Sequence, residues 1–368
     1  MTRYRAAVIG LGRIASTFDD EIETYDIHGA PHAHIACFAA APEIEIVGLA
    51  DTWEEQREAA RRRWGIDAVF ADYRQMLRDT KPDIVSVCTS AKPRADIMLE
   101  IANGSYGVRA IRAEKPLCFS LQEADAVIEA CRSNHIIVSV NCVRRWHPIF
   151  RRALALIEDG WLGDIQHVQA LGQCVMTNNG SHLLTTLTMF ARARADWVMG
   201  EAESTAVDDD GDFEAAGYVA FGNGVRGYFR SFANGPDRHR GEIEEWEFSV
   251  TGTGGMIRLV QDGRAPELWT AEEPRPGMNR ITMVRRTFPV PTTTRSASLE
   301  AVYDLLACIE RGAEPRCTAE DAREALEIAI AARESHRRGN VRVDLPLPDR
   351  SLQIIEPPHY DIPKALQR

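Results

Sequence analysis

Short apolar runs alternate with longer amphipathic segments over the first 145 residues. The runs, whose length and β-branched content predict strands, lie at 4–9, 44–50, 84–88, 108–113 and 136–140. The segments between them, whose apolar spacing predicts helices, lie at 52–64, 73–78, 94–102 and 121–132. Regular alternation of strand and helix is typical of a parallel, doubly wound sheet. We therefore predict one α/β domain over residues 1–145.

The rhythm changes after residue 145. A helix is predicted at 148–159, and a final helical pair at 298–311 and 319–337. Between them, predicted strands lie at 165–175, 201–207, 213–221, 225–232, 244–251 and 256–261, whereas 274–291 has the composition of a loop. Turn signals such as Gly222-Asn223-Gly224 join several of these strands, as in antiparallel hairpins. We predict a second α/β domain over 146–368 with a large, mainly antiparallel open sheet.

Composition narrows the function classes. A chain of 368 residues and 41.0 kDa suits two domains, and its net charge of −11 argues against a nucleic-acid partner. No apolar stretch approaches the roughly 20 residues of a membrane span, and the N-terminal apolar run lacks the features of a secretory signal. The eight cysteines are scattered without a CxxC pair, which favours free thiols in a reducing compartment. We expect a cytoplasmic protein with no membrane association.

The first chemical motif is a GxGxxA turn after the first strand. Gly10 and Gly12 would let the backbone approach a pyrophosphate at the start of a helix. Asp51 ends the second strand, where a carboxylate can accept the ribose hydroxyls of NAD and repel the 2′-phosphate of NADP; an alternative is that Asp51 is only a helix N-cap. Because 39 residues separate Gly12 from Asp51, against about 20 in most such domains, we expect an insertion at 16–31.

The second motif, Glu114-Lys115-Pro116, follows a strand at the carboxyl edge of the predicted sheet, where ligands of such folds bind. Taken alone it is also compatible with an exposed turn. The order of GxGxxA, Asp51, the strand 85–89 and this tripeptide resembles the Gfo/Idh/MocA family of oxidoreductases (glucose-fructose oxidoreductase, inositol dehydrogenase, rhizopine catabolism). Further matches lie at 144–148, 160–163, 180–182 and 335–346, so the resemblance covers nearly the whole chain.

The resemblance implies an N-terminal Rossmann domain that binds NAD and a C-terminal α/β domain that binds substrate and forms homodimers or homotetramers. It assigns Lys115 a place beside nicotinamide and substrate. The family's D-x-G-x-H-x-x-D pattern occurs here at 178–185 with the histidine as His182, while Asn178 and Thr185 replace the two aspartates. The NAD-binding residues that we expect are Gly10, Gly12, Arg13, Ile14, Asp51, Thr89, Ser90, Glu114, Lys115 and Arg145.

Oxidation of a secondary alcohol needs a base within hydrogen-bond reach of the hydroxyl while hydride leaves the carbon. His182 suits that role, and Lys115 could be either the base or the cation that stabilises the developing alkoxide. Asn178 could hydrogen-bond substrate or position Lys115. His182 on an apolar helix could also be an ordinary core histidine, an alternative that only the resemblance makes less attractive.

We therefore predict an NAD-dependent dehydrogenase or reductase of a sugar, polyol, cyclitol or sugar derivative. Two alternatives stay open: an NAD-using glycosidase or lyase that acts by transient oxidation and elimination, and a catalytically idle NAD- or sugar-sensing protein. We expect no metal, since the run at 208–210 is typical of a solvated turn and His28, His32 and His34 have no fourth ligand in sight. The insertion at 16–31 is either a surface excursion or a cover over the cofactor or substrate entrance.

Overall fold

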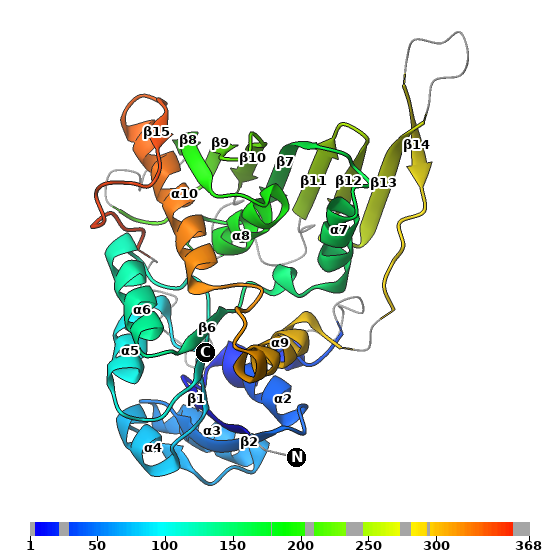
Figure 1. The fold of residues 1–368 in the computed structure, drawn as a ribbon. Helices are drawn as coiled ribbons and strands as arrows, with labels where there is room; N and C mark the ends of the chain where they lie inside the picture. The colour runs from blue at the N-terminus through cyan, green and yellow to red at the C-terminus, as the bar shows by residue number, and fades with distance from the viewer. Residues whose placement is uncertain are drawn as a thin grey trace. The chain divides into compact units, whose positions relative to one another are not determined.

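The computed structural model describes residues 4–21, 29–177, 179–202, 210–232, 246–272, 281–292 and 295–355 (Figure 1). These residues form two units. The first holds the described residues of Met1–Trp146 and Thr293–Arg323, and the second holds those of His147–Thr292 and Glu324–Ile355. Each unit is built around its own sheet.

The first unit contains the predicted parallel, doubly wound sheet. Its six strands run in the order β3-β2-β1-β4-β5-β6 and all pair in parallel. Their bounds are β1 Tyr4–Ile9, β2 Ile44–Ala50, β3 Val69–Phe70, β4 Ile84–Val87, β5 Ala110–Ala113 and β6 Ile137–Val140. The strand order reverses between β1 and β4, which is where folds of this type bind nucleotides at the carboxyl ends of their strands.

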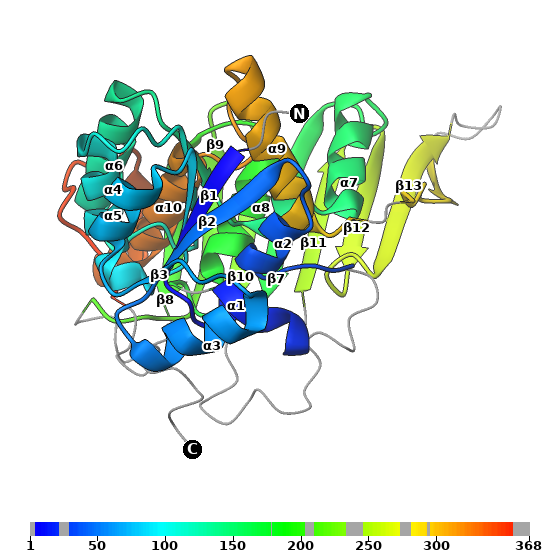
Figure 2. The same ribbon diagram turned by 90° about the horizontal axis from the view of Figure 1, so that it is seen from below.

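Helices cover both faces of this sheet (Figure 2). One face carries α4 (Tyr73–Thr80), α5 (Ala91–Asn103) and α6 (Leu121–Ser133). The other carries α2 (His34–Ala39) and α9 (Ala297–Arg311). The remaining helices of the unit are α1 (Arg13–Ser16), η1 (Phe18–Glu21), α3 (Glu54–Trp64) and η2 (Val143–Arg145).

Helix α9 belongs to the core of the first unit, although in sequence it comes after residues 147–292 of the second unit. Its apolar face, which comprises Leu299, Val302, Leu305, Leu306 and Ile309, is buried in one cluster with Val8 of β1, Ile35 and Phe38 of α2, and Leu49 of β2. The N-terminal domain predicted over residues 1–145 therefore does not include α9, one of the helices that form this core.

The second unit has a nine-stranded sheet in the order β14-β13-β12-β11-β7-β10-β9-β8-β15. Its strands are β7 Ile165–Gly172, β8 Ala195–Ala202, β9 Ala215–Phe221, β10 Arg226–Ser231, β11 Trp246–Gly252, β12 Gly255–Val260, β13 Ala265–Glu272, β14 Thr282–Arg286 and β15 Val343–Asp344. All neighbours pair antiparallel except β7 and β10. The predicted fold class, a parallel sheet followed by a large and mainly antiparallel one, is confirmed.

Three helices lie on one face of the second sheet (Figure 1): α7 (Pro148–Glu158), α8 (Gly180–Ala191) and the C-terminal part of α10 (Ala319–Arg337). Phe150 of α7 packs on Phe248 of β11 with ring centroids 5.3 Å apart. At Gly200 of β8 a side chain would lie 2.7 Å from Ala332 of α10, so the strand needs glycine to admit the helix.

A row of large side chains is exposed on the same sheet. Met199 of β8, Tyr218 of β9 and Tyr228 of β10 occupy paired positions on three neighbouring strands, with exposures of 44%, 36% and 40%. Side chains at paired positions point to the same face of a sheet. The three residues therefore form one contiguous apolar patch, which we call the sheet patch.

The structure corrects several predicted elements. The strand predicted at 201–207 is β8, which ends at Ala202, and residues 203–207 lie outside the described residues. Strand β13 has no predicted counterpart, because Ala, Pro and Glu give it little strand propensity. The stretch 274–291, predicted as a loop, contains the edge strand β14. The sequence does not predict this strand because two of its five residues are charged arginines. None of the described helices is both long and apolar enough to cross a membrane.

Candidate functional site

The glycine turn joins β1 to α1 at the point where the sheet order reverses. Gly10 has a φ of +85°, and a Cβ there would lie 2.8 Å from the backbone nitrogen of Thr89, so only glycine fits between the ends of β1 and β4. Gly12 is the N-cap of α1, and a Cβ built on it meets nothing within 4 Å. This open space beside a helix start, which we call the Gly12 cradle, leaves room for the pyrophosphate of a dinucleotide.

Arg13 and Ile14 begin helix α1, which has only four residues. The Nε of Arg13 donates to both carboxylate oxygens of Glu21, at 2.6 and 2.7 Å, and its guanidinium lies 4.3 Å from the ring centre of Phe18. Two residues of the predicted insertion, Phe18 and Glu21, thus contact Arg13 of the glycine turn. A role of Arg13 or Ile14 in binding NAD remains a prediction.

Asp51 lies directly against the glycine turn. Its Oδ2 accepts a hydrogen bond from Leu11 N at 2.7 Å, and its Oδ1 accepts one from Trp53 N at 2.9 Å. The N-cap of α3 is Trp53, so the alternative that Asp51 is merely that N-cap, with Thr52 starting the helix, is wrong. Instead the carboxylate joins the end of β2 to the turn after β1, and its contact with an adenosine ribose remains a prediction.

Thr89 and Ser90 follow β4, and Ser90 is the N-cap of α5. A buried side chain that the sequence did not single out, Arg94 of α5, ties this turn to the next one. Its Nη2 donates to Thr89 O and its Nη1 donates to Pro116 O. Arg94 therefore links the β4–α5 turn to the Glu114-Lys115-Pro116 turn, and Gly10 of the glycine turn lies close against the first of these turns.

Glu114 is 5% exposed and accepts three hydrogen bonds. Its Oε1 accepts from Nε2 of His34 at 2.9 Å and from Nδ2 of Asn141 at 2.5 Å, and its Oε2 accepts from the backbone nitrogen of Lys115 at 3.2 Å. Burial alone would raise the pKa of Glu114, but the hydrogen bond from His34 and the charges of Lys115 and Arg94 lower that pKa to about 2. Glu114 is therefore an anion that fixes the backbone of Lys115.

Arg145 is buried in the first unit. Its Nη1 lies 3.1 Å from Oδ2 of Asp321 and donates to Arg316 O at 3.1 Å. Of the two adjacent arginines, Arg144 and Arg145, Arg145 is therefore the one that pairs with a structural carboxylate, that of Asp321. A contact of Arg145 with NAD remains a prediction.

His182 belongs to the second unit, at the third position of α8, and is half-buried. Asn179 is the N-cap of this helix, whereas Asn178 lies outside the described residues. Thr185, which stands where the resemblance has an aspartate, is buried and donates its hydroxyl to Ser181 O at 2.7 Å. Thr185 thus hydrogen-bonds within the first turn of the helix that carries His182 and adds no charge there.

An aspartate that the sequence did not single out anchors the loop before α8. Oδ1 of Asp212 accepts from Thr177 N and from Phe213 N, each at 2.9 Å, and its Oδ2 accepts from the Thr177 hydroxyl. Burial raises the pKa of Asp212 against the lowering effect of these hydrogen bonds. A carboxylate is thus supplied to this loop from the β9 side, although the sequence motif itself has lost both of its aspartates.

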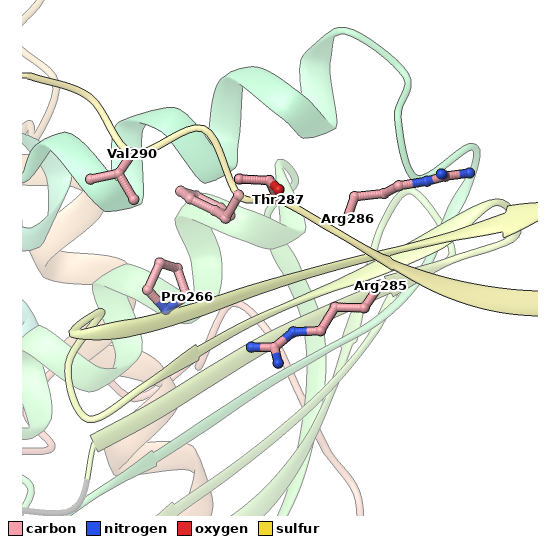
Figure 3. Close-up of a pocket in the computed structure, with 6 residues that line it drawn as sticks. Pro266, Arg285, Arg286, Thr287 and Val290 are labelled. Carbon is pink, nitrogen blue, oxygen red and sulfur yellow. The ribbon is translucent and has the colours of Figure 1, made fainter.

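The second unit also has a shallow hollow beside β13 and β14, lined by Pro266, Arg285, Arg286, Thr287, Phe288 and Val290 (Figure 3). The two arginines extend away from each other, and carboxylates of β13 approach both of them: Glu267 lies 3.6 Å from Arg285 and Glu272 lies 2.9 Å from Arg286. The hollow therefore offers no concentrated positive charge and none of the predicted site residues. Within the described ranges, no group of three His, Cys, Asp or Glu side chains is arranged to bind a metal.

Comparison with known proteins gives matches over both units. The sequence model GFO_IDH_MocA, described as an oxidoreductase family with an NAD-binding Rossmann fold, matches residues 4–142, and its companion for the C-terminal alpha/beta domain matches residues 161–345. Myo-inositol 2-dehydrogenase of Thermotoga maritima is 21% identical over 90% of this chain and 96% of its own. The scyllo-inositol 2-dehydrogenase (NAD(+)) of Bacillus subtilis is 23% identical over 92% and 95%.

A similar fold occurs in the crystal structure of an inositol dehydrogenase homolog from Azotobacter vinelandii, complexed with NADH and myo-inositol. The TM-score is 0.71 at 20% sequence identity, and the match covers 93% of this chain and 98% of that one.

Proposed function

Because the chain belongs to the Gfo/Idh/MocA oxidoreductase family, we propose that it catalyses NAD-dependent hydride transfer at a secondary alcohol of a sugar, polyol, cyclitol or sugar derivative. The observation that carries this proposal is the Glu114-Lys115-Pro116 turn, which is bound through Arg94 to the turn that lies against Gly10. The relatives named for inositol oxidation support the substrate class.

NAD would bind along the edge of the parallel sheet. Gly10 and Gly12 would face its pyrophosphate, Asp51 its adenosine ribose, and the turns at Thr89-Ser90 and Glu114-Lys115 its nicotinamide half. Bound NAD supplies the acceptor for the hydride that leaves the alcohol carbon. The carboxylate of Asp51 would disfavour the extra phosphate of NADP.

The chemistry that remains for the protein is movement of one proton. Oxidation breaks the O–H and C–H bonds of the alcohol: the proton goes to a protein base, and the hydride with both electrons goes to NAD. His182 and Lys115 are the two candidates for the base, and whichever is not the base would stabilise the developing alkoxide. Asn178, which lies outside the described residues, would hydrogen-bond the substrate or position Lys115.

The test is a screen of polyols, aldoses, glycosides and inositols in the presence of NAD, in which oxidation is detected as the appearance of NADH absorbance. We expect one or a few related substrates to be oxidised, with weaker activity when NADP replaces NAD. Lys115→Ala serves as the matched control, because it removes the proposed catalytic ammonium and leaves the Gly12 cradle intact. Release of an aglycone from a glycoside without net NADH would instead indicate oxidation followed by elimination.

The same proposal includes assembly through the sheet patch. Helices cover the other face of the second sheet, whereas Met199, Tyr218 and Tyr228 remain exposed as a contiguous row. Exposed apolar patches of this kind favour interfaces, and a two-fold axis through the patch would bury it in a homodimer or homotetramer.

None of the eight cysteines takes part in a disulfide, which fits a reducing, cytoplasmic compartment.

A further inference from the structure

A buried polar network lies beneath the Glu114-Lys115-Pro116 turn. Its five members come from different elements and are nearly inaccessible: Ser86 of β4 and His34 of α2 are 0% exposed, Arg112 of β5 is 1%, Asn141 after β6 is 4%, and Glu114 after β5 is 5%. Buried polar groups are costly unless they are hydrogen-bonded, so the hydrogen-bond partners of each member decide what this cluster does.

The hydrogen bonds fix the tautomer of the histidine. An ionised Glu114 can only accept, so Nε2 of His34 carries the hydrogen that Glu114 Oε1 accepts at 2.9 Å. In the neutral ring Nδ1 then accepts from the hydroxyl of Ser86, at 2.5 Å. Asn141 is oriented in the same way, because Nη2 of Arg112 donates to its Oδ1 at 3.0 Å while its Nδ2 donates to Glu114.

Burial and the nearby charge of Arg112 lower the pKa of His34 to about 4, while the pKa of Glu114 is lowered to about 2. At neutral pH the pair is therefore a neutral imidazole and a carboxylate. In these protonation states Nε2 of His34 donates to Glu114 and Nδ1 accepts from Ser86.

Serine, histidine and glutamate in one hydrogen-bonded row are also the residue types of a hydrolase triad. Here, however, both the hydroxyl and the ring are fully buried, so no substrate can reach Ser86. The carboxylate instead uses its second oxygen, Oε2, to accept from the backbone nitrogen of Lys115. The row therefore ends at a lysine on the ligand-binding edge of the sheet and does not lead to a nucleophile.

We propose that His34 is a positioning residue for Lys115: it locks the Glu114 carboxylate, which in turn holds the Lys115 backbone, and so it sets where the lysine side chain starts. The inference rests on the proposed function for its catalytic consequence. The segment before α2 holds His34 in place, because Asp19 accepts from His32 N at 2.7 Å and from Ala33 N at 2.9 Å. The described part of the 16–31 insertion thereby supports the catalytic turn.

Three substitutions separate this role from general stability. His34→Gln can keep a donor close to the position of Nε2, facing Glu114. His34→Asn is one methylene shorter and keeps a polar atom only on the Ser86 side. His34→Leu keeps the bulk and neither hydrogen bond. The matched control is Ile35→Ala, because Ile35 is fully buried in the same helix and has only apolar contacts to lose.

We expect His34→Leu and His34→Asn to lower kcat by about 10- to 100-fold with changes of under about threefold in KM, because a displaced catalytic group costs rate more than binding. His34→Gln should recover most of the loss. The NADH Kd, measured by fluorescence titration, should stay within about threefold, since the Gly12 cradle is untouched. Ile35→Ala should lower the unfolding midpoint without the loss in kcat.

A direct readout is available because the chain has only four lysines, Lys81, Lys92, Lys115 and Lys364. Reductive ¹³C-methylation followed by NMR gives one resolvable lysine signal for each, and Lys115→Arg assigns the signal of Lys115. In the cofactor-free protein we expect that signal to shift in His34→Leu and His34→Asn and to return in His34→Gln. If His34→Leu does not fold, the comparison of Gln with Asn decides the same question.

The proposal is overturned if Asn and Gln give the same kcat and the same Lys115 signal as the wild type, or if Ile35→Ala reproduces the losses. Failure of the proposed function looks different, because the wild type would then neither bind NADH nor oxidise any member of the substrate panel. In that case the Lys115 signal of the cofactor-free protein still decides whether His34 positions the lysine.

Discussion

Replacement of Asp51 by Asn should change the choice of cofactor. The carboxylate lies at the turn where the adenosine ribose would bind, and both of its oxygens are held by backbone N–H groups of Leu11 and Trp53, so it cannot turn away from an added 2′-phosphate. At a separation of about 5 Å and an effective dielectric between about 20 and 80, one pair of like charges costs about 1–3 kcal/mol. NADH should therefore bind about 5- to 150-fold more tightly than NADPH, and Asp51→Asn should remove most of that preference.

The same hydrogen bonds predict a separate cost in stability. An Asn side chain has one acceptor oxygen, so either Leu11 N–H or Trp53 N–H loses its partner, which costs about 1–2 kcal/mol at this partly buried site. Asp72→Ala is the control: Asp72 accepts from Arg74 N at 2.9 Å as the N-cap of α4, so its loss should lower stability by about 1 kcal/mol without altering the NADH-to-NADPH ratio.

Fluorescence titrations of NADH and NADPH against the wild type and both variants measure the ratio, and urea unfolding measures the stability. A wild type that binds NADPH as tightly as NADH, or an Asp51→Asn variant with an unchanged ratio, would refute the assignment of Asp51 to the ribose.

Four further outcomes are expected. Lys115→Ala and His182→Ala should each lower turnover by roughly 10²–10⁴ with little change in the NADH Kd; near-normal turnover in one of them would leave the other as the base. Asp212→Ala should lower kcat and leave the NADH Kd nearly unchanged, because it removes the hydrogen bonds that hold the loop before α8. Parallel measurements of turnover and of NADH binding on this variant test that expectation. Folding lowers the pKa of His34 from 6.5 to about 4, so the unfolded chain binds the proton at a higher pH than the folded protein does. The free energy of unfolding should therefore fall by roughly 2–4 kcal/mol as the pH falls from 6.5 to 4. Urea unfolding across that pH range should show a smaller fall for His34→Gln than for the wild type. Tyr228→Glu places a charge in the sheet patch and should shift light scattering toward monomers, whereas a wild type that is already a monomer at micromolar concentration contradicts the assembly.

Local patterns in the sequence were enough to predict the frame of the site. Strands β1 and β2 and helix α10 have the predicted bounds, because each is a strongly periodic segment with clear turn signals at its ends. The glycine turn and Asp51 were also predictable, since their chemistry depends on residue type at the end of a strand. A parallel sheet brings those ends to one edge without further information.

The network around Glu114 was not predictable in the same way. His34 lies 80 residues before Glu114, and its position depends on a helix whose start is fixed by Asp19, a residue that pattern analysis treats as part of a polar insertion. One signal was nevertheless present: Ser86 and Arg112 are polar residues inside otherwise apolar buried strands. Such interruptions indicate that a polar partner must come from elsewhere in the fold.

The return of α9 to the first unit has a consequence for synthesis of the chain. The parallel sheet is translated by residue 140, but one of its faces cannot be closed until α9, which ends at Arg311, has left the ribosome. At 5–20 residues per second that interval is roughly ten to thirty seconds, during which the face that Leu299, Val302 and Leu305 will cover is open. Fragments that stop after residue 146 keep that face exposed permanently and should aggregate, so a nucleotide-binding half cut from this chain needs α9 fused to it in order to be soluble.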